Sequence, residues 1–76
     1  MSVEYVERLR IQQIAGLPPE SFDYRFLDKR TAQRDFLRAK ANPQCVFGEL
    51  WREETKGDEV KHVIIDSFES KPLRVK

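Results

Sequence analysis

Residues 44–68 read Gln44-Cys-Val-Phe-Gly-Glu-Leu-Trp-Arg-Glu-Glu-Thr-Lys-Gly-Asp-Glu-Val-Lys-His-Val-Ile-Ile-Asp-Ser-Phe68, and this stretch decides the fold. Two runs rich in β-branched and aromatic residues flank a Lys-Gly pair, which is the pattern of a β-hairpin. A two-residue loop at 56–57 places Thr55 opposite Asp58, and the same register places Trp51 opposite His62. The stretch contains most of the bulky apolar side chains, so we expect it to form the centre of the fold.

In this register both faces of the hairpin are largely apolar. A three-residue loop would shift the pairing and exchange the faces of the second strand, but both faces would still be substantially apolar. One face carries Cys45, Phe47, Trp51, Val60, His62, Ile64 and Phe68. The other carries Val46, Gly48, Leu50, Val63 and Ile65. A single helix covers only one face of a small sheet, and the face with the small residue Gly48 suits a close helix contact. The aromatic face is therefore expected to need another cover: the N-terminal segment folded as a helix, a second copy of the chain or a different macromolecule.

A helix is predicted over residues 29–41, directly before the hairpin. Asp28 is a suitable N-cap because its carboxylate accepts a backbone hydrogen bond from the first turn. Asn42-Pro43 ends the helix, since the residue before proline is pushed out of the helical region. The apolar stripe of this helix consists of Ala32, Phe36 and Ala39.

The segment before this helix predicts a strand over residues 22–27. Phe22, Tyr24 and Phe26 alternate with Asp23 and Arg25, as in a strand that is buried on one face. The preceding Pro18-Pro19 pair cannot continue a helix or donate to a strand ladder, so it is interpreted as a stiff connection.

Residues 2–14 fit two interpretations. Read with a period of two, Val3, Tyr5, Leu9 and Ile11 share a face that is broken only by Glu7. Read as a helix, the segment has capping signals at both ends, but its apolar residues scatter around the circumference. We favour a strand and keep the helix as the alternative.

The predicted fold class is α+β, with a mainly antiparallel four-stranded sheet in β-β-α-β-β order and one helix on one face. The alternative order, α-β-α-β-β, makes residues 2–15 helical. The whole chain, residues 1–76, is expected to form a single domain in which residues 69–76 are a polar tail.

Composition excludes several classes of protein. Fourteen basic residues against 13 acidic ones give a net charge of +1, which is no broad attraction for nucleic acid or membrane. The single cysteine, Cys45, permits no intramolecular disulfide, and one cysteine with one histidine makes a poor zinc site. With no long apolar run, we expect a soluble cytoplasmic protein without a membrane span, a metal or another cofactor.

No catalytic residues are predicted. His62 and Asp66 share a strand face, but four strand residues span about 13 Å, which is too far for a hydrogen bond. Ser67 points to the opposite face, and the predicted register keeps Cys45 far from His62. We therefore expect a protein that is not an enzyme.

The aromatic face of the hairpin leads to the main functional hypothesis, a small protein-binding or adaptor module. Its partner would be an unidentified protein or a second copy of the chain. The residues expected to bind are Phe47, Trp51, His62, Ile64 and Phe68. The alternative is a nucleic-acid-binding protein that uses the basic helix, where cations contact phosphates. Its residues would be Arg25, Lys29, Arg30, Arg34 and Arg38.

Overall fold

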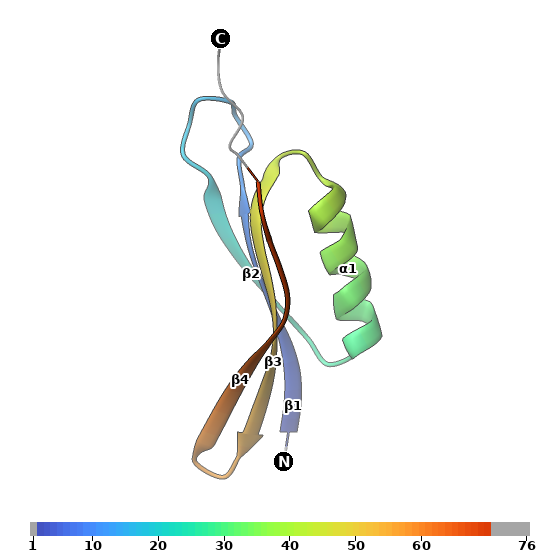
Figure 1. Cartoon of the computed structure of the whole chain (residues 1–76). Helices are drawn as coiled ribbons and strands as arrows, with labels where there is room; N and C mark the ends of the chain where they lie inside the picture. The colour runs from blue at the N-terminus through green and yellow to red at the C-terminus, as the bar shows by residue number, and fades with distance from the viewer. Residues whose placement is uncertain (1, 71–76) are drawn as a thin grey trace.

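The computed structural model describes residues 2–70 and consists of one antiparallel four-stranded sheet with a helix against one face (Figure 1). The elements are β1 (Ser2–Ile11), β2 (Glu20–Phe26), α1 (Lys29–Ala41), β3 (Cys45–Lys56) and β4 (Glu59–Glu69). The strands lie in the order β2-β1-β3-β4. The predicted fold class and element order are therefore confirmed. Of the predicted tail, Glu69 belongs to β4, and residues 71–76 lie outside the described residues.

Strand β1 settles the ambiguity of residues 2–14 in favour of a strand. It pairs with β2 on one side and with β3 on the other, so both of its edges are hydrogen-bonded. Its odd-numbered residues face the helix, and Leu9 is buried while Tyr5 and Ile11 pack against the core. The interruption expected at Glu7 does not break the pattern, because Glu7 is itself fully buried on that face.

Helix α1 begins and ends where its capping residues predict. The backbone N–H and the hydroxyl of Thr31 both donate to Asp28 Oδ2, at 2.9 and 2.8 Å. These bonds lower the pKa of the Asp28 carboxyl group. At the other end the N–H of Asn42 donates to the Ala39 carbonyl, and Pro43 follows. The buried residues of α1 are Ala32, Phe36 and Ala39, as predicted.

The core lies between α1 and the centre of the sheet. Phe36 is its largest buried side chain, and its ring centroid is 5.4 Å from that of Phe68. Gly48 lies under both rings, and a Cβ at this position would overlap the Phe68 ring. The close approach expected at Gly48 is thus present, and it admits an aromatic ring from β4 as well as the helix.

The hairpin has a different register from the predicted one. Its loop is Gly57-Asp58, and Lys56 pairs with Glu59. Gly57 has a φ of +59°, which glycine adopts without strain, so glycine takes the first loop position. As a result Trp51 pairs with Ile64 rather than with His62. The change equals two residues, so side chains near the turn keep their predicted faces.

Two irregularities correct the predicted faces further from the turn. Leu50 pairs with Asp66 and Trp51 with Ile64, which leaves Ile65 as an extra residue in β4. An extra residue reverses the alternation beyond it, so Phe68 faces the helix instead of sharing a face with Trp51. A second irregularity, where β1 ends against β3, places Cys45 in the core rather than beside Phe47.

The molecule is elongated, with principal extents of 51 × 23 × 14 Å. Helix α1 lies against one part of the twisted sheet, and the turn end of the β3–β4 hairpin extends beyond it together with the start of β1 (Figure 1). We call the side of the sheet opposite α1 the open face; no helix within residues 2–70 lies against it (Figure 1).

The contact at Gly48 gives a test of the core. We expect Gly48→Ala to lower the free energy of unfolding by about 1 to 3 kcal/mol, because the added methyl group meets the Phe68 and Phe36 rings. Thermal or urea unfolding measures the change. The double variant Gly48→Ala/Phe68→Leu should lose less stability than the two single changes added together. Strict additivity would show that the ring does not occupy this space.

Candidate functional site

The open face carries an aromatic centre among charged side chains. The residues of this face include Glu4, Val6, Arg8, Arg10, Asp23, Arg25, Phe47, Glu49, Trp51, Glu53, Val60, His62 and Ile64. A hollow of about 460 Å³ lies on this face. It is lined by Val6, Arg8, Asp23, Arg25, Trp51, Glu53 and His62. Four strands therefore contribute to one surface, which makes the open face the candidate site.

Trp51 is the aromatic centre of the hollow and is held in place by neighbours on β3 and β4. Its indole Nε1–H donates to Glu49 Oε2 at 2.7 Å. The His62 ring meets it edge to face, with centroids 5.4 Å apart and planes at 75°. Aromatic pairs of this geometry are favourable beyond the area that they bury. Trp51 is thus fixed in orientation although it remains half-buried.

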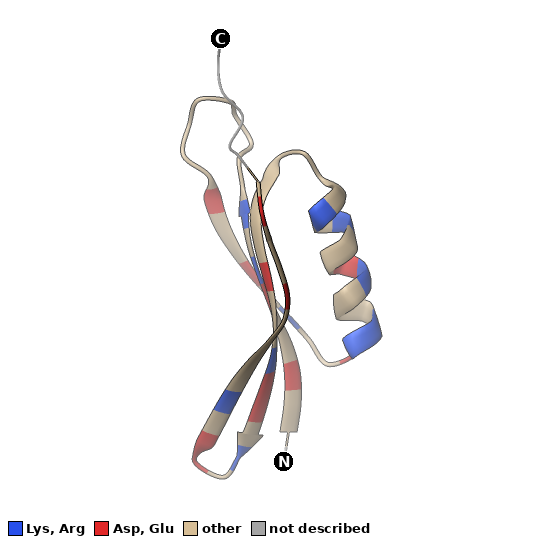
Figure 2. Ribbon diagram, viewed as in Figure 1, with Lys and Arg blue, Asp and Glu red and all other residues tan. Residues whose placement is uncertain are grey.

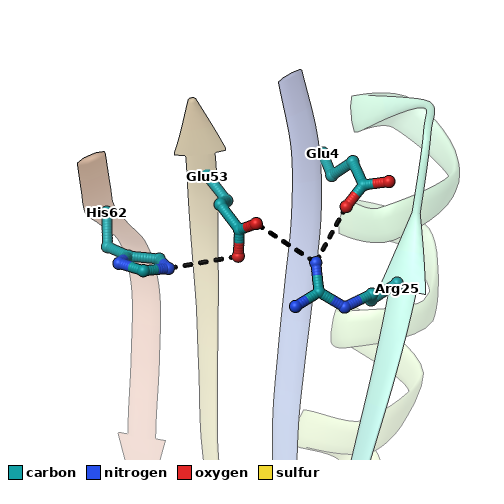
Figure 3. A network of polar contacts seen from close by, with 4 residues as sticks. All are labelled: Glu4, Arg25, Glu53 and His62. Carbon is teal, nitrogen blue, oxygen red and sulfur yellow. Dashed lines mark hydrogen bonds and ion pairs between the residues drawn. The ribbon is translucent and has the colours of Figure 1, made fainter. Parts of the chain in front are cut away.

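A polar network crosses the open face from β2 to β4 (Figure 3). Arg25 Nη1 donates to Glu4 Oε2 at 2.8 Å and to Glu53 Oε1 at 3.3 Å. The second oxygen of Glu53 lies 3.1 Å from His62 Nε2. Arg25 and then His62 lower the pKa of the Glu53 carboxyl group, and the two carboxylates raise the pKa of Arg25. Glu53 therefore stays ionised and links the two edge strands through side chains.

Two further contacts involve arginines of β1. Arg8 Nε is 3.2 Å from Asp23 Oδ1, and the Arg10 guanidinium lies 5.2 Å from the centroid of the Phe47 ring. Cation–π contacts of this kind cover an aromatic face without removing the charge from water. The open face is therefore more polar than the predicted apolar surface.

The structure brings together four of the five predicted protein-binding residues. Phe47, Trp51, His62 and Ile64 lie on the open face, whereas Phe68 packs against Phe36 on the other side. The residues that sequence reasoning missed are those of β1, chiefly Val6 and Arg8. Their signal was present, because the even-numbered residues of a strand face away from its buried odd-numbered ones.

The predicted nucleic-acid-binding residues are divided between two surfaces. Lys29, Arg30, Arg34 and Arg38 lie exposed along α1, and the ribbon of the helix shows basic residues at several positions (Figure 2). Arg25 instead points to the open face, where it is paired with Glu4 and Glu53. Of the five predicted residues, the four on α1 therefore share one surface and Arg25 does not.

A buried carboxyl group lies between the sheet and the helix. Glu7 has no exposed surface, and neither of its oxygens has a hydrogen-bond partner among the described residues. Burial, with a further contribution from Asp35 on α1, raises the pKa of Glu7 to about 8. Cys45 is its other titratable neighbour, and burial raises the pKa of that thiol also. Glu7 is therefore mainly protonated at neutral pH.

The remaining chemistry is limited. Within residues 2–70, no three side chains among His, Cys, Asp and Glu are placed to hold a metal ion. The thiol of the buried Cys45 donates to the Phe47 carbonyl at 3.4 Å, and His62 lies on the open face. Asp66 faces the helix side, so the prediction that it shares a strand face with His62 is wrong. Helix α1, the one helix in the described part, is too short and polar to cross a membrane.

Comparisons with protein-family models, with curated proteins and with solved structures give no match. A proposed function for this chain therefore depends on the side chains of the open face.

The buried Glu7 gives a prediction for the pH dependence of stability. Its carboxyl group has a pKa of 4.5 in its ordinary state and about 8 in the folded chain. Between these values unfolding releases a proton, so stability falls as the pH rises through this window, by at most roughly 1.4 kcal/mol per pH unit. Glu7→Gln removes the titrating group, and we expect its stability relative to the parent chain to increase steadily with pH.

Urea unfolding at several pH values between pH 4.5 and about 8 measures this difference. The matched control is Glu20→Gln, which alters an exposed carboxyl group at the start of β2. The control should leave the pH dependence of the parent chain unchanged. Parallel pH profiles for Glu7→Gln and the parent chain would contradict the assigned burial of Glu7.

Proposed function

We propose that this chain is a small protein-binding module whose open face, centred on Trp51, contacts a protein partner. The observation that carries the proposal is the hollow around Trp51, which α1 does not cover and which four strands line with oriented side chains. A half-buried tryptophan with arginines beside it is the composition typical of residues that dominate binding energy in protein interfaces.

The exposed apolar residues of the hairpin support the same role. Ile64 and Val60 are 57% and 52% exposed on the open face. Ile64 pairs with Trp51, so the two residues form one apolar strip along β3 and β4. Burial under a partner gains about 25 cal/mol for each Å² of apolar surface removed from water.

The charges of the open face favour a protein over a nucleic acid. Its arginines, Arg8, Arg10 and Arg25, alternate with carboxylates, and Arg8 and Arg25 are already paired with acidic neighbours. A phosphate backbone would meet these carboxylates as well as the arginines. A protein surface with its own mixture of charges and apolar groups matches this pattern better.

The ion pairs also support binding rather than catalysis as the role of this face. Both acid–base groups next to Trp51, Glu53 and His62, are engaged with each other, and Glu53 is also held by Arg25. The lowered pKa of Glu53 suits a structural ion pair and makes this carboxylate a weak base. We therefore infer a module that is not an enzyme.

Replacing the aromatic residues tests the proposal. Trp51→Ser and Phe47→Ser remove large side chains from the open face, and each should weaken binding at least about tenfold. The control is Leu37→Ser, which removes an apolar side chain that is 63% exposed on α1, away from the open face. Proteins retained from a cell extract by the parent chain and the control, but not by the two variants, are then purified for direct titration.

The titration follows the fluorescence of Trp51, the one tryptophan of the chain, as a purified candidate is added. We expect a shift for the parent chain and for Leu37→Ser, with circular dichroism confirming that Phe47→Ser remains folded. Equal affinities for Phe47→Ser and Leu37→Ser would overturn the proposal.

The alternative, nucleic-acid binding, would now rest on the four basic residues of α1. It predicts that single-stranded DNA or RNA binds with an affinity that falls steeply as salt increases. The variant Arg34→Ala/Arg38→Ala would reduce both the affinity and its salt dependence. An electrophoretic or fluorescence shift with these properties, unaffected by Phe47→Ser, would replace the protein-binding proposal with this one.

A further inference from the structure

Strand β4 forms an edge of the sheet, with β3 on one side and no strand on the other among residues 2–70. The residues flanking a two-residue loop, here Lys56 and Glu59, form a hydrogen-bonded pair, and such pairs alternate along an antiparallel ladder. The backbone groups of Val60, His62 and Ile64 therefore point away from β3. A strand edge of this kind pairs readily with another strand.

The middle of this edge carries apolar side chains that are open to solvent. Val63 and Ile64, at the middle of β4, are 56% and 57% exposed and lie on opposite faces of the sheet. Strands at sheet edges usually discourage pairing by means of lysines and extra residues. Strand β4 has both features, in Lys61 and in the extra residue Ile65. Here, however, the two features together allow a second copy to pair.

The extra residue Ile65 places Lys61 and Asp66 on the same face. Lys61 pairs with Glu54 and Asp66 with Leu50, and these two β3 residues share the helix side of the sheet. Without Ile65, residues 61 and 66 would lie on opposite faces, because their numbers differ in parity. Neither forms an ion pair with another of the described residues, although Asp66 Oδ1 accepts from the Ser67 N–H.

We propose that a second copy of this chain pairs antiparallel with the outer edge of β4, with Val63 of one copy beside Val63 of the other. The outward backbone groups of His62 then form hydrogen bonds with those of Ile64 in the other copy. The side chains of these two residues lie on the same face of the joined sheet. With Ile65 again left as the extra residue, Lys61 faces Asp66 twice across a two-fold axis. The edge is therefore complementary to itself in charge and in backbone pattern, and the two sheets become one.

At the other edge of the sheet, β2, the charged side chains at the middle of the strand already have ion-pair partners. On β2 the charged residues Asp23 and Arg25 are already held within their own chain, by Arg8 and by Glu4 and Glu53. Pairing through β2 would therefore gain no new ion pair from Asp23 or Arg25 while these contacts last. On β4 the opposite charges meet only when a second copy supplies the partner, which favours β4 as the self-associating edge.

Pairing through β4 and the proposed partner binding use different surfaces, because pairing leaves the hollow around Trp51 uncovered. The copies meet edge to edge, so both open faces lie on one side of the joined sheet. The pair would present two binding surfaces to partners, which raises the apparent affinity for a partner that engages both.

Charge reversal tests the proposal through the oligomeric state. Sedimentation equilibrium should show a dimer for the parent chain, and Lys61→Asp or Asp66→Lys should each raise the dimer dissociation constant at least about tenfold. Each single change places like charges opposite each other twice. The double variant Lys61→Asp/Asp66→Lys should regain the dimer, and so should an equimolar mixture of the two single variants.

Lys29→Asp is the control, since it reverses an exposed charge at the start of α1, away from β4. It should dimerise like the parent chain. A monomer at all concentrations, a dimer indifferent to both single reversals, or reversals that the double variant does not rescue would each overturn the proposal. A dimer lost in Phe47→Ser but kept in Lys61→Asp would show that copies associate through the open face instead.

Discussion

The packing of Phe36 against the sheet is the contact on which the rest of the structure depends. Gly48 leaves room for this ring and for that of Phe68, so the helix and β4 share one aromatic contact over the centre of the sheet. Helix α1, the only helix of the described chain, packs on the side of the sheet that carries Gly48. The opposite side is therefore left open. A domain of this size has a small stability margin, so the helix side must hold most of the core.

The open face combines paired charges with an apolar centre at Trp51. Its charges are paired across strands, as in the link from Arg25 through Glu53 to His62. Trp51 is ordered by its contacts with Glu49 and His62, and under the proposed function such order would lower the entropy cost of binding. The proposed binding thus requires no refolding of the open face, because its side chains are already ordered in the free chain.

The sequence predicted the elements well and the details of their pairing less well. Alternation in β2 and the caps of α1 marked those elements, because each depends on neighbouring residues. The register of the hairpin depends on which residue takes the positive φ, and Gly57 was assigned one position too late in the loop. The extra residue Ile65 has no local signal, so Phe68 was expected on the wrong face.

The candidate site shows the same limit. The hairpin residues Phe47, Trp51, His62 and Ile64 were recognised as one surface, because alternation places them together. The contribution of β1 could not be read from the hairpin alone, since it requires knowing that β1 lies between β2 and β3. The burial of Glu7 could not be predicted from the sequence either. A carboxyl group on an apolar face suggests a break in the strand and not a protonated core residue.

The central claim is that the open face is uncovered in the free chain, and Trp51 reports on it directly as the one tryptophan present. Quenching of its fluorescence by acrylamide should be intermediate between that of free indole and that of a fully buried tryptophan. It should not change with chain concentration, because pairing through β4 leaves Trp51 open. Strong protection of Trp51 in the dilute chain would contradict the account, since another part of the molecule would then cover the face.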